Sequence, residues 1–361
     1  MHTPTLSIIV PVLNEAETLP ALFATLAVQS DLLFEIILSD GGSIDGTVEQ
    51  ARQLAKESPF ACTVVSGESG RGRQLNTGAA VAQGETLLFL HADSSFTDPR
   101  ALYKGVVALE EAISARANDQ VAGHFALRFL RCDDTPSLAY TYYEYKARLD
   151  RSGCTHGDQG FLLRRTFFQS VGPFDEALPL LEDTRLAEKI RQAGTWILLP
   201  AEIWTSARRF EIEGLYERQL LNALLMNIAA IGWEAFFRAA PGIYRRQDRT
   251  QRLQLLPFLA KIQELLRLLP WRERFRLWYR TGCYVRGNAW QLALAWEVRR
   301  QFRQGVALSE MTTPCLHVFD RCFDRLTDHP PGRLASMILV WSWFHLTRWR
   351  LRLQRAGALP T

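Results

Sequence analysis

The sequence lacks several features that would assign it to a class at once. Its six cysteines include no Cys-X-X-Cys pair, which excludes the common zinc-ligand spacings and predicts reduced thiols in the cytoplasm. No basic segment followed by an apolar stretch and a cleavage site precedes the first predicted strand, so we expect that the chain is not exported. No nucleic-acid recognition motif accompanies its basic residues, so no nucleic-acid partner is expected.

What the sequence does have is an uneven distribution of charge. Residues 1–240 contain 21 Lys and Arg against 30 Asp and Glu, whereas residues 241–361 contain 21 against 8. The second stretch also holds seven of the ten tryptophans. This asymmetry predicts two domains with different partners, residues 1–240 and a basic, Trp- and Arg-rich helical domain of residues 241–361.

The hydrophobic pattern of the first part alternates between strand and helix. Short apolar runs at residues 6–12, 34–38, 63–65 and 86–90 are separated by segments with helical periodicity. This predicts an α/β fold with a mostly parallel central sheet flanked by helices. Further strands are predicted at 121–130, 160–163 and 196–199, further helices at 137–149, 182–192 and 214–238, and only helices beyond about residue 250.

Polar residues follow three of the predicted strands, where open parallel sheets bind their ligands. These are Asn14 and Glu15, then Asp40, then His91-Ala92-Asp93. Asn14 can equally cap the next helix. The imidazole of His91 and the carboxylate of Asp93 could converge on Mg²⁺ or Mn²⁺ together with substrate phosphates. The alternative is that Asp93 caps a turn and His91 is structural.

Three further segments carry charge at predicted helix or strand ends. The stretch 67–76 is rich in Gly and Arg and precedes a helix predicted at 77–82, so Arg71 and Arg73 could hold phosphate or line a sugar pocket. Glu182 and Asp183 precede a helix, where carboxylates either complement the helix dipole or supply a base. Arg208 and Arg209 end a predicted strand and could grip a diphosphate or form a solvated pair.

Together these segments resemble the family 2 glycosyltransferases of the GT-A fold over about residues 5–235. Within them the sequence is most similar to a bacterial branch associated with radical-SAM and selenium-domain proteins. The resemblance rests on seven ordered segments, residues 9–15, 39–47, 70–76, 90–93, 157–160, 181–183 and 206–209.

The resemblance implies an inverting transfer of a sugar from a UDP- or GDP-type donor to an acceptor hydroxyl. It implies that Asp183 is the general base with Glu182 beside it, and that Asp93 coordinates Mn²⁺ or Mg²⁺. Arg208 and Arg209 would stabilise the leaving diphosphate, and Asp40 would hydrogen-bond the base. The remaining expected substrate contacts are Pro11, Asn14, Glu15, Arg71, Arg73, Asn76, His91, Asp158 and Gln159.

Two positions depart from the family pattern. Gly41 stands where a second aspartate is usual at the base-binding turn, and His91 stands in place of the first aspartate of the metal motif. Neutral imidazole is a poor ligand for a hard cation, so His91 could instead bond to the donor. These departures keep open a nucleotide-binding scaffold without catalysis. A sugar nucleotidyltransferase is a further alternative, although its Gly-rich loop would follow the first strand.

The C-terminal segment from Arg333 to Arg355 predicts a helix, with Leu334, Ile338 and Trp341 at helical spacing. Its apolar stretch is too short to cross a bilayer. One interpretation is a helix at the inner face of a membrane, close to a lipid-linked acceptor. The other is the core of a helical domain with arginines on its solvated face.

Overall fold

The computed structural model describes residues 4–245, 247, 252–355 and 357, and within them the chain divides into two compact units at Ala207/Arg208. The change in charge along the sequence predicts a domain boundary at residues 240/241 instead. The helices between these points belong to the second unit because helix α9 (Leu215–Ile231) packs against α10 (Glu234–Arg245) and α12 (Trp271–Gly287).

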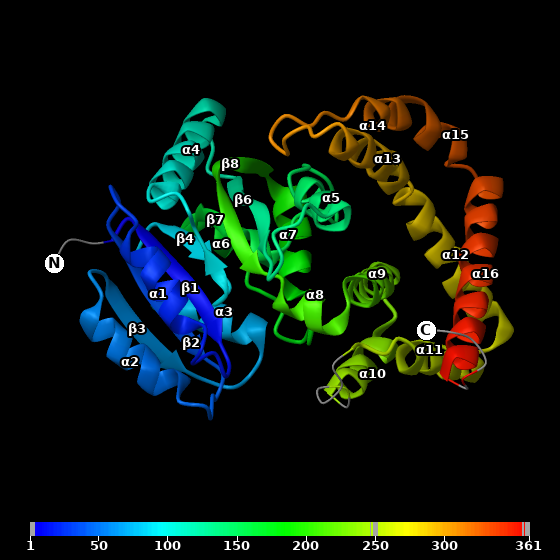
Figure 1. Cartoon of the computed structure of the whole chain (residues 1–361), viewed down its shortest axis with the longest axis horizontal. Coiled ribbons are helices and arrows are strands. Elements are labelled where there is room, and N and C mark those ends of the chain that lie inside the picture. Colours follow the sequence, from blue (N-terminus) through cyan, green and yellow to red (C-terminus); the bar gives the residue numbers. More distant parts are fainter. Residues whose placement is uncertain (1–3, 246, 248–251, 356, 358–361) are drawn as a thin grey trace. The chain divides into compact units, whose positions relative to one another are not determined.

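The first unit is built on one sheet, whose described strands follow the order β3-β2-β1-β4-β7-β6-β8-β5 (Figure 1). Strands β1 to β4 pair in parallel, β6 and β8 are also parallel, and β7 runs antiparallel to both β4 and β6. The mostly parallel sheet is confirmed. Strand β7 matches the strand predicted at 160–163, its antiparallel direction was not predicted, and the short β5 is an addition. The strands are β1 Leu6–Val12, β2 Phe34–Asp40, β3 Ala61–Ser66, β4 Thr86–Phe89, β5 Ser94–Ser95, β6 Val121–Leu130, β7 Phe161–Arg164 and β8 Thr195–Ser206.

Helices cover the sheet because alternate strand residues on both of its faces are apolar. On one face Ile9, Phe89 and Phe161 form a buried cluster with side chains of α3, α6 and α7. On the other face α4 lies so close that a Cβ on Gly105 would be 3.1 Å from the Phe125 ring. The helices are α1 Leu19–Ala27, α2 Thr47–Glu57, α3 Arg71–Val81, α4 Ala101–Arg116, α5 Leu138–Lys146, α6 Arg165–Val171 and α7 Glu182–Ala193, with the 3₁₀ turn η1 Gly157–Gln159.

Three sequence predictions need correction at helix ends. Helix α3 begins at Arg71 rather than at residue 77, so the Arg-rich segment is itself helical. The helix predicted at 214–238 is two helices, because Gly232 ends α9 with a left-handed φ of 67°. Arg208 does not end a strand, since β8 stops at Ser206 and Arg208 is the first residue of helix α8 (Arg208–Glu213).

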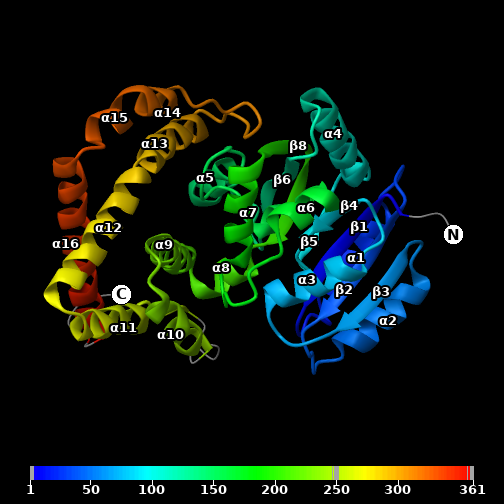
Figure 2. The same ribbon diagram turned by 180° about the vertical axis from the view of Figure 1, so that it is seen from behind.

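The second unit is helical throughout its described residues, as the sequence predicted. Helices α12 and α16 lie side by side, which both views show (Figure 2). A Cβ on Gly282 of α12 would be 2.6 Å from the backbone N of Met337, so only glycine permits this approach. Beyond α8 to α10 and α12, the elements are α11 Leu256–Leu268, α13 Trp290–Arg303, α14 Pro314–Val318, the π-helical η2 Phe319–Phe323, α15 Asp324–Thr327 and α16 Pro330–Arg355.

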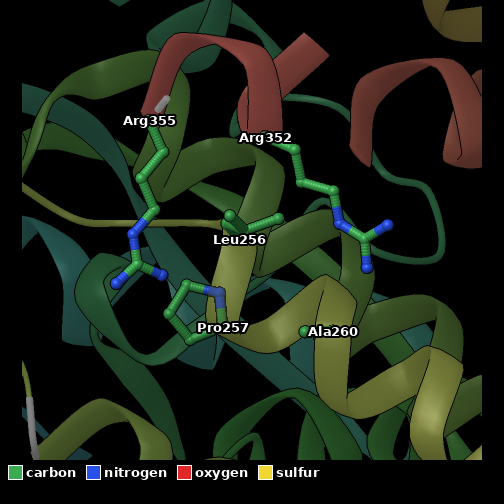
Figure 3. Close-up of a pocket in the computed structure, with 5 residues that line it drawn as sticks. All are labelled: Leu256, Pro257, Ala260, Arg352 and Arg355. Atoms are coloured by element: carbon green, nitrogen blue, oxygen red, sulfur yellow. The ribbon is translucent and has the colours of Figure 1, made fainter. Parts of the chain in front are cut away.

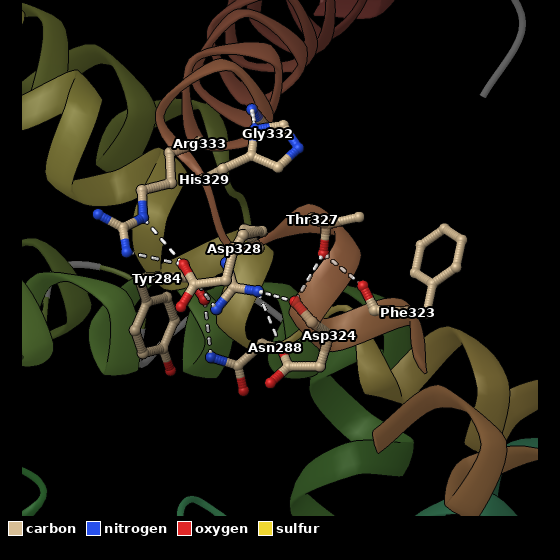
Figure 4. A network of polar contacts seen from close by, with 10 residues as sticks. Tyr284, Asn288, Phe323, Asp324, Thr327, Asp328, His329, Gly332 and Arg333 are labelled. Atoms are coloured by element: carbon tan, nitrogen blue, oxygen red, sulfur yellow. Dashed lines mark hydrogen bonds and ion pairs between the residues drawn. The ribbon is translucent and has the colours of Figure 1, made fainter. Parts of the chain in front are cut away.

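Helix α16 confirms the helix predicted at 333–355, and ion pairs hold its first turn and the preceding α15 (Figure 4). Arg333 Nε donates to Asp328 Oδ1 at 2.9 Å, and Arg286 Nη1 of α12 donates to Asp324 Oδ1 at 2.9 Å. Arg286 and Arg333 are therefore neutralised by carboxylates. Across the described part of the chain, no helix is both long and apolar enough to pass through a bilayer.

Candidate active site

The loops that follow β1 and β2 are hydrogen-bonded to each other at the carboxyl edge of the sheet. Asn14 has a left-handed φ of 55°, and its Oδ1 accepts the Ile44 N–H at 2.9 Å. The Glu15 N–H donates to Thr47 Oγ1 at 2.8 Å. Asn14 therefore does not cap α1, whose N-cap residue is Thr18 and lacks a side-chain cap hydrogen bond. These hydrogen bonds hold the two loops against each other.

Asp40 ends β2 and is only 3% exposed. Its Oδ2 accepts the Gly42 N–H at 3.0 Å, and its Oδ1 accepts the Ser43 N–H at 3.2 Å. Pro11 lies opposite Ser39 in the β1–β2 register, one residue from this carboxylate. The structure thus places Pro11, Asn14, Glu15 and Asp40 along one edge, where Asp40 shapes its own turn and retains acceptor capacity for a ligand.

Gln74 joins β1 to β2 at this same edge, a role that the sequence analysis missed. Its Nε2 donates to Val12 O and to Ser39 O, both at 2.8 Å, and the side chain is buried. A Cβ on Gly41 would lie 2.9 Å from Gln74 Cδ. The Gln74 amide therefore occupies the space beside residue 41, and glycine is the residue that leaves room for it. The signal in the sequence that could have indicated this bridge is a glutamine on the inner face of the Arg-rich helix.

Arg71, the first residue of α3, brings the β4 loop and the start of α7 together. Its Nη2 lies 3.0 Å from His91 Nε2, and its Nη1 donates to Glu182 Oε1 at 3.5 Å. Glu182 is buried, so burial and then the neighbouring Asp183 raise its pKa, which Arg71 opposes. A small cavity beside Arg71, His91 and Asp183 has the rings of Phe89, Phe161 and Phe174 in its walls.

Asp183 is held between two backbone N–H groups at the start of α7. Its Oδ2 accepts the Gly157 N–H at 2.8 Å, and its Oδ1 accepts the Thr184 N–H at 2.7 Å. Burial alone would raise the pKa of Asp183, but Arg71, His156 and the Gly157 N–H together bring it below its ordinary value. A Cβ on Gly157 would be 2.9 Å from both Asp183 Oδ2 and His91 Nε2, so these two groups face one point.

Asp93 lies between β4 and β5, half-buried, with Thr205 Oγ1 donating to its Oδ2 at 3.4 Å. No cluster of three or more His, Cys, Asp or Glu ligands for a metal is found in the described residues. A single carboxylate still fits Mg²⁺ or Mn²⁺, because these ions take their remaining ligands from water and substrate phosphates. His91 does not fit as a ligand, since its Nε2 faces the Arg71 guanidinium, which would repel a cation.

Asp158 and Gln159 form the 3₁₀ turn next to Gly157. Gln159 is buried, and its Nε2 donates to Cys154 O at 2.7 Å, so it supports the turn. The Oδ1 atom of Asp158 is buried without a hydrogen-bond partner among the described residues. Burial, followed by the charges of Asp183 and Asp93, raises the pKa of Asp158 to about 7. Asp158 therefore gains a proton near neutral pH and changes the charge of the site.

This raised pKa predicts a stability change for Asp158→Asn. The folded protein binds the Asp158 proton more tightly than the unfolded chain, so wild-type stability falls as pH rises from about 4 to 7. Asparagine removes that loss, so the variant should be more stable than wild type at pH 8, by ~2 kcal/mol after discounting for partial exposure. The advantage should vanish by pH 4. Urea unfolding in EDTA at both pH values measures it, and a pH-independent difference would contradict the shift.

Two residues predicted to contact substrate have other partners. Arg73 forms ion pairs with Glu68 and Glu176. Asn76 binds the Phe174 backbone, accepting its N–H at 2.9 Å and donating to its carbonyl at 3.0 Å. The helical periodicity of α3 explains this, because Arg73 and Asn76 lie on different sides of the helix from Arg71. Neither contact involves the residues gathered at Arg71. Arg208 and Arg209 open the second compact unit.

Comparison with known proteins covers the sheet and part of this site. A family model described as Glycosyl transferase family 2 matches residues 7–171. The PGL/p-HBAD biosynthesis glycosyltransferase of Mycobacterium tuberculosis (strain ATCC 25177 / H37Ra) is 29% identical over 185 residues, which are 51% of this chain and 68% of that protein. The undecaprenyl-phosphate 4-deoxy-4-formamido-L-arabinose transferase of Pseudomonas syringae pv. syringae (strain B728a) is 33% identical over 92 residues, 24% of this chain and 27% of its own.

Among solved structures, the chain is similar to the mannosyltransferase PcManGT from Pyrobaculum calidifontis in complex with GDP-Man and Mn²⁺. The TM-score is 0.48 and the identity 19%, over 97% of this chain and 88% of the other. The family match itself includes Asp40, Arg71, Asp93 and Asp158. It ends before Glu182 and Asp183, so the family model says nothing about those two positions.

Proposed function

Since the chain belongs to glycosyl transferase family 2 and is a glycosyltransferase with a GT-A-type fold, we propose that it transfers a sugar with inversion from a nucleoside-diphosphate donor. The acceptor is a hydroxyl group and the cation is Mn²⁺ or Mg²⁺. The observation that carries this proposal is the position of Arg71, which contacts His91 and Glu182 and lies within the electrostatic reach of Asp93, Asp158 and Asp183. The positive charge of the Arg71 guanidinium thereby lies among the acidic side chains that such a transfer needs.

In the proposed reaction Asp183 is the general base. It is ionised at neutral pH because Arg71 and backbone N–H groups stabilise its charge, so it can accept the proton of the acceptor hydroxyl. The acceptor oxygen then bonds to the anomeric carbon while the bond from that carbon to the diphosphate oxygen breaks. The electron pair leaves with the nucleoside diphosphate, whose new negative charge Arg71 stabilises. A metal ion bound at Asp93 would add charge stabilisation at the same phosphates.

The edge built from Pro11, Asn14, Glu15 and Asp40 is the proposed nucleoside site. Its loops are joined by hydrogen bonds of their own, so the donor would meet a preformed surface. Arg208 and Arg209 keep their proposed role at the leaving diphosphate, as the first residues after the sheet unit. Arg73 and Asn76 are proposed instead to hold the segment around Phe174 and Glu176.

The acceptor is proposed to be lipid-linked, with the enzyme at the inner face of a cytoplasmic membrane. One relative is named as an undecaprenyl-phosphate 4-deoxy-4-formamido-L-arabinose transferase, and that name supports a lipid-linked acceptor here. Membership of the branch associated with radical-SAM and selenium-domain proteins stays a prediction from the sequence.

Calorimetric titration with UDP and GDP, each with and without Mn²⁺, tests the proposal. We expect one nucleotide to bind in the micromolar range and Mn²⁺ to strengthen it. A screen of nucleotide sugars with mass spectrometry then identifies the transferred sugar. Release of pyrophosphate from a nucleoside triphosphate and a sugar phosphate would indicate a nucleotidyltransferase instead. Nucleotide binding without turnover of any donor would indicate a scaffold.

Replacing Arg71 should show that its positive charge keeps the proposed base, Asp183, ionised. In Arg71→Gln the pKa of Asp183 should rise, because the largest opposing positive charge is gone. The acidic limb of the pH–rate profile should therefore move to higher pH, and kcat should fall by roughly 10²- to 10³-fold through lost charge stabilisation. Arg71→Lys keeps the charge and should recover part of the rate. An unshifted pH profile in Arg71→Gln would remove Arg71 from this role.

A further inference from the structure

A cavity of about 510 Å³ in the second unit lies between the start of α11 and the end of α16, and its lining is Leu256, Pro257, Ala260, Arg352 and Arg355 (Figure 3). The two arginine side chains extend from the last turns of α16 toward α11, one on each side of Leu256. The walls are thus apolar from α11 and cationic from α16. None of these residues belongs to the proposed transfer site.

The electrostatics of this cavity favour an anion. Leu256 and Pro257 are in the first turn of α11, at the positive end of the helix dipole. Arg352 and Arg355, in the last turn of α16, add two positive charges beside it. In the described residues, neither forms an ion pair with an acidic side chain, whereas Arg286 and Arg333 at the other end of α16 do. An anion bound in the cavity would therefore pair with two arginines that no acidic side chain of the described residues occupies.

A third arginine beside the cavity supports this interpretation. Arg348 is only 7% exposed, and its Nε atom has no hydrogen-bond partner among the described residues. Its Nη1 donates to Gln263 Oε1 of α11 at 2.8 Å, which ties the two helices together. Burial lowers the pKa of Arg348, and the nearby Arg352 and Arg267 lower it further. Positive charge is therefore concentrated where α11 meets α16.

The surface next to the cavity is apolar and exposed. Trp349 precedes Arg352 by three residues and Leu346 precedes Trp349 by three, so they form one ridge along α16. Leu346 is 63% exposed, Trp349 61%, and Leu339, two turns before Leu346, 70%. The inner side of α16 is also apolar, with Phe344 buried against Trp278 of α12. A helix that is apolar on two sides needs a second apolar surface to contact.

We propose that the α11–α16 cavity binds the phosphate headgroup of an anionic membrane lipid while the ridge of Leu339, Leu346 and Trp349 enters the interface beside it. Positive charge next to exposed Trp and Leu is the combination that anionic bilayer surfaces attract. The site holds the enzyme at the membrane surface without a spanning segment. It depends on the second unit only, so it can fail or succeed independently of the proposed transfer chemistry.

The test is sedimentation of the full chain with phosphatidylcholine vesicles, with and without 30% phosphatidylglycerol. Arg352→Gln/Arg355→Gln should lower partitioning onto the anionic vesicles by about 30-fold, since each arginine contributes a factor of about five. The matched control is Arg52→Gln/Arg116→Gln, which removes the same charge from exposed positions of the first unit and should change partitioning less than threefold. If both variants lost vesicle partitioning equally, net charge alone would explain the loss, and the proposed headgroup site would be wrong.

Two further measurements test whether Trp349 enters the bilayer and whether the cavity binds free phosphate instead of a lipid headgroup. Brominated lipid should quench wild-type tryptophan fluorescence, and Trp349→Phe should lose a measurable part of that quenching. Inorganic phosphate is tested by thermal shift at constant ionic strength. If it stabilises wild type but not the arginine variant, and neither binds vesicles, the cavity takes free phosphate and the membrane role is wrong. UDP and GDP binding should be unchanged in the arginine variant, which keeps this result apart from the donor site.

Discussion

Asp183→Asn should abolish sugar transfer while leaving the nucleotide bound. The asparagine amide has nearly the same shape, but it cannot accept the acceptor proton, so kcat should fall by roughly 10³-fold or more. The affinity for the nucleoside diphosphate should stay within about threefold of wild type, because Asp183 contacts Gly157 and Thr184 rather than the β1–β2 edge. Single-turnover transfer assays and calorimetric titration on the same preparation measure the two effects.

A loss of structure must be distinguished from a loss of the base. Asparagine has one carbonyl oxygen, so it can accept from either the Gly157 N–H or the Thr184 N–H, and the other is left unpaired at a cost of about 1–3 kcal/mol. Thermal unfolding should show this smaller effect. Glu188→Gln, which removes a carboxylate from the same helix away from Arg71, is the matched control and should keep transfer within about threefold. If Asp183→Asn retained transfer, Asp183 would not be the general base, and Asp158 would be the first residue to test in its place.

The centre of the sheet was predictable from the sequence because β1, β2, β4 and most of β6 are buried on both faces. Such strands appear as continuous apolar runs, and the predicted ranges of β1 and β6 match the observed ones. The antiparallel β7 could not be assigned its direction, because a short apolar run carries no information about its neighbour. Strand β5 has only two residues, too few for any periodicity to show.

The site was predictable where residue type alone limits the chemistry. Asp93, Asp183 and Arg71 were all named from the sequence, and the structure gathers them through α3, the β4 loop and α7. What the sequence could not show is which charges touch. Arg73 was expected to act like Arg71, but two residues along a helix turn a side chain away from the site. The bridge made by Gln74 depends on two strand ends that meet only in the folded chain.

His91 and Asp93 are the pair for which structure changes the interpretation most. A His-X-Asp sequence suggests two ligands converging on one ion. The Arg71 guanidinium 3.0 Å from His91 Nε2 reassigns the imidazole to the hydrogen-bonding network of the site. The two residues should therefore respond differently to substitution, and this difference makes the metal proposal testable.

Asp93→Asn should remove the dependence of the enzyme on the divalent cation. We expect kcat/KM at saturating Mn²⁺ to fall by at least 10²-fold, because a neutral amide leaves the ion without its only charged protein ligand. Nucleoside diphosphate should then bind as weakly with Mn²⁺ as wild type does in EDTA. Titration of Mn²⁺ and Mg²⁺ against transfer rate, with nucleotide calorimetry beside it, measures both.

His91→Gln is the comparison that decides between one ligand and two. If Asp93 alone holds the ion, this variant should keep the wild-type concentration of Mn²⁺ for half-maximal rate and lose turnover only, through its contact with Arg71. Asp98→Asn controls for loss of a nearby carboxylate, since Asp98 pairs with Lys104 at 2.6 Å. A shift of tenfold or more in the Mn²⁺ requirement of His91→Gln would make His91 a ligand, and Arg71 would then have to leave it when metal binds.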